Sequence, residues 1–269
     1  MAQAPLPASD YVSRAPDARG VVAYSKAEHA IWAELYARQQ AAIADCACPE
    51  FLHGLDLLKL PQHRVPQLSE VSARLRRETG WQVAAVPALI PFSEFFALLA
   101  AKRFPAATFI RRREHLDYLQ EPDIFHELFG HTPLLTNPWF AAFTQRYGEI
   151  GLAASREDRA FLARLYWFTV EFGLLRRPDA ALSIYGGGIL SSPGETAYAL
   201  GPAPQHRPFS LIEVLRTPYR IDVLQPLYYV LDSFRQLHEL SQADLLTAVA
   251  DARRLGLHAP LFPPKSLAA

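Results

Sequence analysis

Three residues from two distant segments, which together can bind a metal, constrain the fold of this chain most. His126 and His131 are five positions apart, and Glu171 follows much farther along the sequence. Two imidazoles and one carboxylate fill one face of a metal ion and leave the opposite face open, as is typical of non-haem iron oxygenases. The fold is therefore expected to bring these two segments together at one point.

The spacing of the two histidines does not suit a regular α-helix. At about 100° per residue, positions five apart point about 140° away from each other. Gly130 allows the helix to end or widen before His131, and Pro133 prevents its clean continuation. A wide turn with hydrogen bonds from i to i+5 would also bring the two rings together. Either geometry directs both imidazoles at one ion.

Glu171 is expected within a long helix that has a broad aromatic face. Burial of an unpaired carboxylate among such side chains is costly, and a metal ion would be a suitable partner. The alternative is that Glu171 lies on a solvated flank of its helix. Two histidines at this spacing are more often coincidental than metal ligands. Taken alone, the three residues suggest a metal site at most, and they do not indicate a particular reaction.

Two known metal motifs are close to this pattern and differ from it. Zinc proteases carry H-E-x-x-H, in which the i, i+4 spacing puts both rings on one helical face. The spacing here is one residue longer, so a role for Glu127 as the base of a protease is not expected. Oxygenases that depend on 2-oxoglutarate usually have a His-x-carboxylate pair and a distant second histidine, which is the reverse of the order here.

Composition indicates a globular protein with a sizeable core. The chain has 269 residues, 50% of them hydrophobic and 12% aromatic, which is enough for one domain. Lys plus Arg and Asp plus Glu number 27 each, so the charge gives no general attraction to nucleic acid or anionic lipid. Neither a membrane-spanning apolar run nor a signal peptide is visible. We therefore expect a cytoplasmic protein without nucleic-acid or membrane partners.

The periodicity of apolar residues predicts an α+β fold, a mainly α-helical single domain with a few short strands. Residues 1–20 are expected to form a mobile tail, and residues 21–269 the domain. Ser25 and Glu28 predict a capping box at the start of the first helix. Helices are expected over residues 25–46, 51–60, 66–79, 91–103, 137–147, 156–175, 226–240 and 241–255, with a motif helix opened by residues 121–123. Strands are expected over residues 81–86 and 108–111, a turn or loop over 185–188, and mixed strand and turn over 213–224.

The two cysteines, Cys46 and Cys48, are too close in sequence for an ordinary disulfide framework. A C-x-C pair can bind a soft metal, but neither a second cysteine pair nor a close histidine pair completes a tetrahedral site. We therefore favour two incidental cysteines at the end of a helix.

Four segments in order resemble motif blocks of the pterin-dependent aromatic amino acid hydroxylases. They are residues 121–135, 166–174, 185–195 and 225–230, within a similarity that covers roughly residues 20–240. The similarity is greatest to the short bacterial members that act on phenylalanine. It implies a single catalytic domain without the regulatory domain and the C-terminal tetramerisation helix of animal relatives, and hence a monomer.

The resemblance also implies an activity. Fe(II) and a tetrahydropterin, such as tetrahydrobiopterin, would use O2 to hydroxylate L-phenylalanine to L-tyrosine, the first step of phenylalanine catabolism. The same chemistry on tryptophan or tyrosine is the nearest alternative, because pocket shape decides between these substrates. From other classes, a zinc metallohydrolase and a non-catalytic metal-binding protein remain.

The resemblance assigns residues to the metal and to the pterin. His126, His131 and Glu171 would hold Fe(II). Phe95 matches the aromatic residue on which the pterin ring stacks. The other positions that match the pterin side are Ile90, Glu127, Ala163 and Tyr166. Asp123, Glu127 and Ser191 are the candidate catalytic residues beside the metal.

The resemblance also assigns a substrate side. Arg111 matches the arginine that binds the substrate carboxylate, for which its planar fork is suited; without the resemblance we would place Arg111 on the surface. Ser191 and Glu195 match positions around the metal and substrate, with Ser191 near His126. The residues that would wall the substrate ring are Pro122, Trp167 and Phe172.

Two positions on the substrate side leave questions open. Asp123 precedes His126 by one turn and either orients that ligand or is a first-turn acid stabilised by the helix dipole. Leu119 stands where animal relatives carry a threonine near the substrate backbone. One polar substrate contact is therefore lost, or replaced by Tyr118 or a water.

Overall fold

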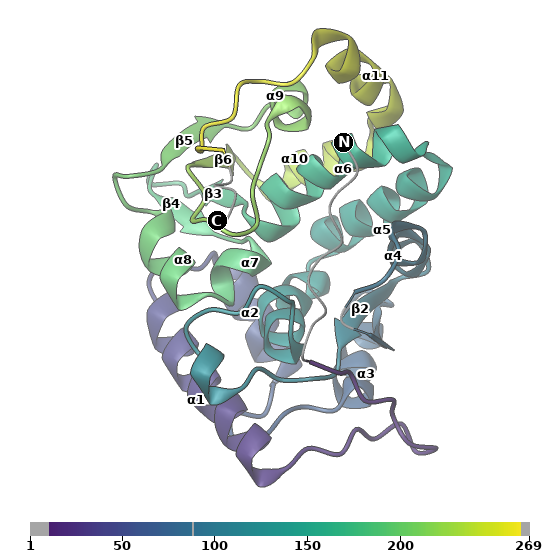
Figure 1. The fold of residues 1–269 in the computed structure, drawn as a ribbon, viewed down its shortest axis with the longest axis vertical. Coiled ribbons are helices and arrows are strands. Elements are labelled where there is room, and N and C mark those ends of the chain that lie inside the picture. Colours follow the sequence, from purple (N-terminus) through teal and green to yellow (C-terminus); the bar gives the residue numbers. More distant parts are fainter. Residues whose placement is uncertain (1–10, 88, 265–269) are drawn as a thin grey trace.

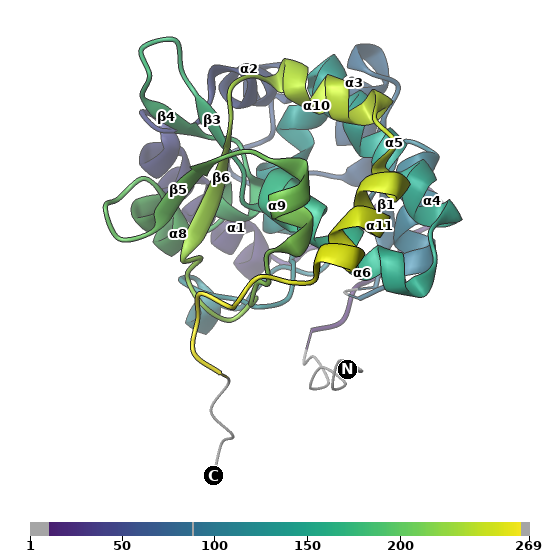
Figure 2. The same cartoon turned by 90° about the horizontal axis from the view of Figure 1, so that it is seen from above.

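The computed structural model describes residues 11–87 and 89–264. Helices make up most of the molecule, and two small sheets lie on opposite sides of it (Figures 1 and 2). This arrangement confirms the expected α+β class. Within the described part of the chain, no helix has the length and apolarity needed to cross a membrane.

The first three helices begin within two residues of their expected starts. Helix α1 (Lys26–Ile43) starts after Ser25, whose side chain accepts the Glu28 N–H while Glu28 accepts the Ser25 N–H. This confirms the capping box and satisfies donors that a helix start leaves free. Helices α2 (Pro49–Leu58) and α3 (Leu68–Glu78) follow, and α3 packs beside the first sheet.

The first sheet pairs two parallel strands, β1 (Gln82–Val86) and β2 (Arg103–Ala107), joined through α4 (Phe92–Ala100). The helix expected over residues 91–103 therefore ends early, and the strand expected over residues 108–111 is wrong. Lys102 has a φ of 55° and turns the chain directly from helix into strand. Pairing with β1 then selects the segment that becomes β2.

The second sheet has four strands in the order β4-β3-β6-β5. The strands are β3 (Leu174–Arg176), β4 (Leu182–Ile184), β5 (Gln205–Pro208) and β6 (Leu227–Leu231). All five residues of β6 are buried, and it pairs in parallel with both β3 and β5. The helix expected over residues 226–240 is therefore wrong in its first half, and α10 (Phe234–Gln242) forms only in the second.

The helix expected over residues 156–175 is interrupted. α6 (Arg156–Tyr166) continues into a π-helical turn, η4 (Trp167–Glu171). The chain then leaves the helix at Phe172, whose φ and ψ are −128° and 34°, and enters β3. The predicted helix was too long because joining the sheet outweighs the helical pattern of the last residues.

The remaining helices complete the fold. They are η1 (Arg113–His115), η2 (His126–His131), η3 (Thr132–Thr136), α5 (Pro138–Ala153), α7 (Gly187–Leu190), α8 (Pro193–Ala199), α9 (Leu211–Arg216) and α11 (Leu245–Leu255). α5 runs six residues past its expected end at residue 147, and α9 forms where strand and turn signals were mixed. η2 and η4 contain the three candidate metal ligands, and α7 packs against both.

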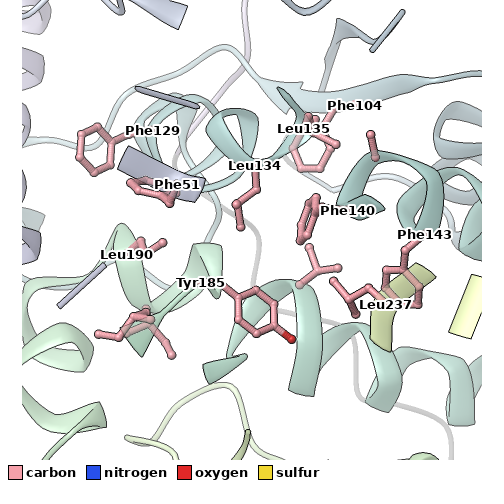
Figure 3. Packing of buried hydrophobic residues seen from close by; sticks show 14 of the residues in the cluster. Phe51, Phe104, Phe129, Leu134, Leu135, Phe140, Phe143, Tyr185, Leu190 and Leu237 are labelled. Atoms are coloured by element: carbon pink, nitrogen blue, oxygen red, sulfur yellow. The ribbon is translucent and has the colours of Figure 1, made fainter. Parts of the chain in front are cut away.

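An aromatic core fixes the back of η2. Phe129 lies beside Phe51 in Figure 3, with a ring-centroid distance of 6.0 Å. Phe129 also stacks on Phe125 at 4.8 Å. These buried rings hold one side of the motif helix in the interior, so its histidines are directed to the other side.

The N-terminal segment, where the structure describes it, packs against the chain after β2. Tyr11 stacks on Phe109 at 4.8 Å, and Ser13 Oγ accepts the Thr108 N–H. The Arg14 N–H donates to Thr108 Oγ1. The expected mobile tail is thus a contact segment from Tyr11 onward, and residues 1–10 lie outside the described residues.

Candidate active site

Two π-helical turns position the three candidate ligands. η2 extends from His126 to His131, and η4 ends at Glu171. In η4 the Phe172 N–H donates to the Trp167 carbonyl, an i to i−5 bond. Of the two geometries expected for the histidine pair, the structure has the wide turn. Such turns are rare in helices and occur frequently at functional sites.

The donor atoms of these residues converge. His131 Nε2 lies 3.0 Å from His126 Nε2 and 3.3 Å from Glu171 Oε2. The distance from His126 Nε2 to Glu171 Oε2 is 3.7 Å. Donors at right angles and about 2.1 Å from one ion would lie about 3.0 Å apart. Three neighbouring coordination positions of a single ion therefore fit this triangle.

The surroundings favour the metal-binding protonation states. Burial, and then the neighbouring His131, lower the pKa of His126 to about 4, so its imidazole is neutral at physiological pH. Burial would raise the pKa of Glu171, but His131 and His126 lower it below its ordinary value.

The three ligands differ in exposure. The side chains of His126 and Glu171 are 19% and 16% exposed, and that of His131 is 1% exposed. The metal position is thus open on one side.

His126 is held from two directions. Its Nδ1 lies 2.9 Å from Ser191 Oγ, at the end of α7. Its backbone N–H donates to Asp123 Oδ1 at 3.0 Å. Asp123 therefore caps the first turn of the motif helix through a backbone bond, while Ser191 contacts the ring.

Arg111 is buried and paired with Asp123. Its Nε and Nη2 lie 2.8 and 2.9 Å from the two carboxylate oxygens. Asp123 is 0% exposed and Arg111 5%, which excludes the surface position considered for Arg111. Burial would raise the pKa of Asp123, but the guanidinium lowers it below its ordinary value. Nη1 is the nitrogen of this fork that Asp123 does not use.

The residues expected on the pterin side lie on three elements. Phe95 in α4 meets Tyr166 at the end of α6 edge to face, at a centroid distance of 5.3 Å. Ala163 precedes Tyr166 by one turn, and Ile90 lies in the loop before α4. Burial raises the pKa of Glu127 well above its ordinary value, and Glu171 raises it further. Glu127 therefore keeps a proton to higher pH than an exposed glutamate.

Trp167 and Phe172, the aromatic wall expected around the substrate ring, have a third aromatic neighbour, Tyr219, that the sequence did not single out. Trp167 lies between Phe172, at 4.3 Å, and Tyr219, at 4.4 Å and nearly parallel. Its indole N–H donates to Gln225 Oε1 at 3.0 Å. Tyr219 comes from the mixed segment before the fourth motif block and has no local signal. Gln225 is the first residue of that motif block, so the block was the one signal in the sequence that could have pointed to Gln225.

Glu195 is tied to the same region. Its Oε1 accepts the Gln225 N–H at 3.1 Å and the hydroxyl of Tyr228. Burial raises the pKa of Glu195 above its ordinary value. Glu195 therefore supports the segment that holds Trp167. Pro122 is half-buried next to Asp123 in the chain.

Other candidates do not belong to the group of three ligands. Cys46 and Cys48 are both free thiols, and Cys48 is fully buried. Leu119 is half-buried, and Tyr118 is 57% exposed. Within residues 11–87 and 89–264, His126, His131 and Glu171 form the one histidine, cysteine and carboxylate group arranged to share a metal ion.

The chain is similar to known proteins over most of its length. A family model for biopterin-dependent aromatic amino acid hydroxylase matches residues 8–245. A phenylalanine-4-hydroxylase of Pseudomonas aeruginosa is 58% identical over 260 residues, which cover 97% of this chain and 99% of the relative. The apo structure of the cold active phenylalanine hydroxylase from Colwellia psychrerythraea 34H is 55% identical, with a TM-score of 0.93 over 96% of this chain and 100% of that chain. The Chromobacterium violaceum enzyme with bound oxidized Fe(III) is 41% identical, with a TM-score of 0.85 over 93% and 94%.

Proposed function

Because this chain belongs to the biopterin-dependent aromatic amino acid hydroxylases, we propose that it converts L-phenylalanine into L-tyrosine, as the first step of phenylalanine catabolism. It does so with O2, Fe(II) and a tetrahydropterin. The observation that carries the proposal is the convergence of two imidazoles and a carboxylate from two π-helical turns. The relative from Pseudomonas aeruginosa, matched over nearly its whole length, is named for the same activity.

His126, His131 and Glu171 hold Fe(II) in this proposal. When bound, the iron and the tetrahydropterin together activate O2 for hydroxylation of the aromatic ring. The protein leaves one side of the triad open for this purpose, because His126 and Glu171 keep part of their exposure while His131 is closed off. Ser191 fixes the ring of His126, and a ligand imidazole fixed in this way keeps its orientation and tautomer.

Phe95, Tyr166 and Glu127 form the pterin side. The edge-to-face contact of Phe95 with Tyr166 fixes the plane of the Phe95 ring, which offers its face to a flat heterocycle. Glu127 is buried next to the metal ligand His126, and its side chain can hydrogen-bond to the pterin. Ile90 and Ala163 provide apolar contacts beside it.

Arg111 and the aromatic wall form the substrate side. Asp123 holds the guanidinium of Arg111 in one orientation, which leaves Nη1 to bind the carboxylate of an amino acid. Trp167 and Phe172, with Pro122, line the position of the substrate ring and exclude water from it. Asp123 connects the substrate side with the metal site, because its carboxylate also accepts the backbone N–H of His126.

Substrate-dependent oxygen uptake tests the proposal. The chain is supplied with Fe(II) and tetrahydrobiopterin, and phenylalanine, tryptophan or tyrosine is added in turn. We expect oxygen uptake coupled to tyrosine formation, with the highest kcat/KM for phenylalanine. No coupled hydroxylation of any of the three would contradict the function, whereas a higher kcat/KM for tryptophan would contradict the substrate alone. Hydrolytic activity with zinc and without pterin would instead support a metallohydrolase.

We also propose that the protein acts as a monomer in the cytoplasm, without nucleic-acid partners. The balanced charge supports the absence of nucleic-acid partners, because 27 basic and 27 acidic residues create no general attraction to polyanions. Light scattering after size exclusion measures the mass, for which 30.1 kDa is expected. A mass of twice that value would contradict the monomer.

A further inference from the structure

Gly187 lies directly against a candidate metal ligand. It is the first residue of α7, and a Cβ built there would lie 2.4 Å from His131 Nδ1 and 2.5 Å from His131 Cε1. Ordinary contact begins at 3.4 Å, so any side chain at this position would displace the ring or the backbone by about 1 Å. A second glycine makes the same approach possible, because a Cβ at Gly130 of η2 would lie 2.6 Å from the Gly187 carbonyl oxygen. The backbone of α7 at Gly187 therefore packs directly against the His131 ring of η2.

The His131 ring has a second close neighbour, Phe104. Phe104 in β2 lies with its centroid 5.2 Å from that of His131, at an angle of 37°. His131 is 1% exposed, and its Nδ1 has no hydrogen-bond partner among the described residues. His126 differs, because its Nδ1 meets Ser191 Oγ. The two candidate ligands are thus held in different ways.

We propose that Gly187 is a positioning residue for the metal centre, and that the His131 ring is oriented by packing against Gly187 and Phe104. The inference rests on the iron site of the proposed function. A ligand imidazole has to be held within about 0.5 Å and 10–20° of its working geometry. Hydrogen bonds usually provide this orientation. At His131 packing provides it, because a side chain at residue 187 would make the ring or the backbone shift.

Metal affinity of the full chain tests the role of Gly187. Metal-free wild type, Gly187→Ala and Gly194→Ala are titrated with Co(II) by calorimetry. Gly194 is a matched control, because it lies in the next helix, α8, and a Cβ there meets nothing within 4 Å. We expect Gly187→Ala to weaken Co(II) binding by about 10-fold or more and to change the visible spectrum of the bound Co(II). Gly194→Ala should keep the wild-type affinity and spectrum.

Wild-type affinity and spectrum in Gly187→Ala would overturn the inference. Failure of the wild type itself to bind Co(II) would overturn the iron site of the proposed function, so the two failures are distinguishable. If Gly187→Ala does not fold, Phe104→Leu decides, with Phe143→Leu as a control in which a fully buried ring of α5 is truncated. We expect weaker Co(II) binding in Phe104→Leu only. Equal affinities in these two variants would overturn the inference.

Discussion

The guanidinium of Arg111 and the carboxylate of Asp123 form a buried bidentate ion pair, with Nε to Oδ2 at 2.8 Å and Nη2 to Oδ1 at 2.9 Å. The same carboxylate accepts the backbone N–H of His126. The residue proposed to bind the substrate carboxylate is therefore one side chain away from the start of the metal-binding turn. A change at Arg111 is expected to alter both substrate binding and stability.

Arg111→Ala should raise the KM for phenylalanine by about 10-fold or more, because a charge-assisted bond of roughly 1.5–3 kcal/mol is lost. It should also destabilise the fold by about 3–5 kcal/mol, because the buried Asp123 loses its counterion. Urea unfolding and steady-state kinetics measure the two effects. Arg113→Ala is the control, since Arg113 is 65% exposed in its pair with Glu34 and exposed pairs contribute about 0–1 kcal/mol. The same KM and stability in both variants would contradict this role for Arg111.

Glu171→Gln should leave the fold intact and weaken iron binding, because a neutral amide replaces the one anionic donor of the triad. Fe(II) retained after anaerobic dialysis and the far-UV circular dichroism spectrum measure the two properties. We expect at least about 10-fold weaker binding, by analogy with the loss of residues that support metal ligands. Glu149→Gln, on the exposed side of α5, is the control and should keep its iron. Wild-type turnover in Glu171→Gln would exclude a ligand role.

Local patterns in the sequence predict some of this structure well. The capping box of Ser25 and Glu28 involves neighbours in the chain, so it can be recognised without the fold. The wide turn between His126 and His131 could be anticipated because a regular helix separates the two rings. Both features depend only on residues a few positions apart.

Features that depend on distant contacts could not be predicted. Residues 227–231 form an apolar run that suits a buried helix as well as a buried strand, and pairing with β3 and β5 decides for the strand. The helical pattern expected to residue 175 is cut short because residues 174–176 pair with β4 and β6 instead. In the site, Gln225 meets Trp167 across 58 positions, and the charge of Arg111 gave no sign that Asp123 would bind it.

Ser191→Ala should weaken metal binding by about 10- to 100-fold, the usual effect of removing a hydrogen bond that orients a ligand imidazole. The Ser191 hydroxyl meets His126 Nδ1 at 2.9 Å, and alanine leaves that nitrogen without this contact. Calorimetric titration with Co(II) measures the affinity. Ser210→Ala is the control, because Ser210 precedes α9 without a side-chain capping bond. Equal affinities in the two variants would show that Ser191 does not orient the ring.

Glu195→Gln should make stability less sensitive to pH. Burial raises the pKa of Glu195 in the folded state above its ordinary value of 4.5, so between these two pKa values the folded protein binds more protons than the unfolded chain. Stability contributed by the protonated form is then complete below about pH 4.5 and is lost as the pH rises through the folded pKa. Glutamine cannot ionise, and its amide oxygen can still accept the Tyr228 and Gln225 bonds.

The free energy of unfolding of Glu195→Gln, relative to wild type, should therefore increase from pH 4 to pH 8. Urea unfolding at both pH values measures this difference. Glu157→Gln is the control, because Glu157 is exposed in the first turn of α6, and its difference from wild type should change less. A relative stability of Glu195→Gln that falls as the pH rises would mean that Glu195 is stabilised as a carboxylate. The hydrogen bonds from Tyr228 and Gln225 would then outweigh the cost of its burial.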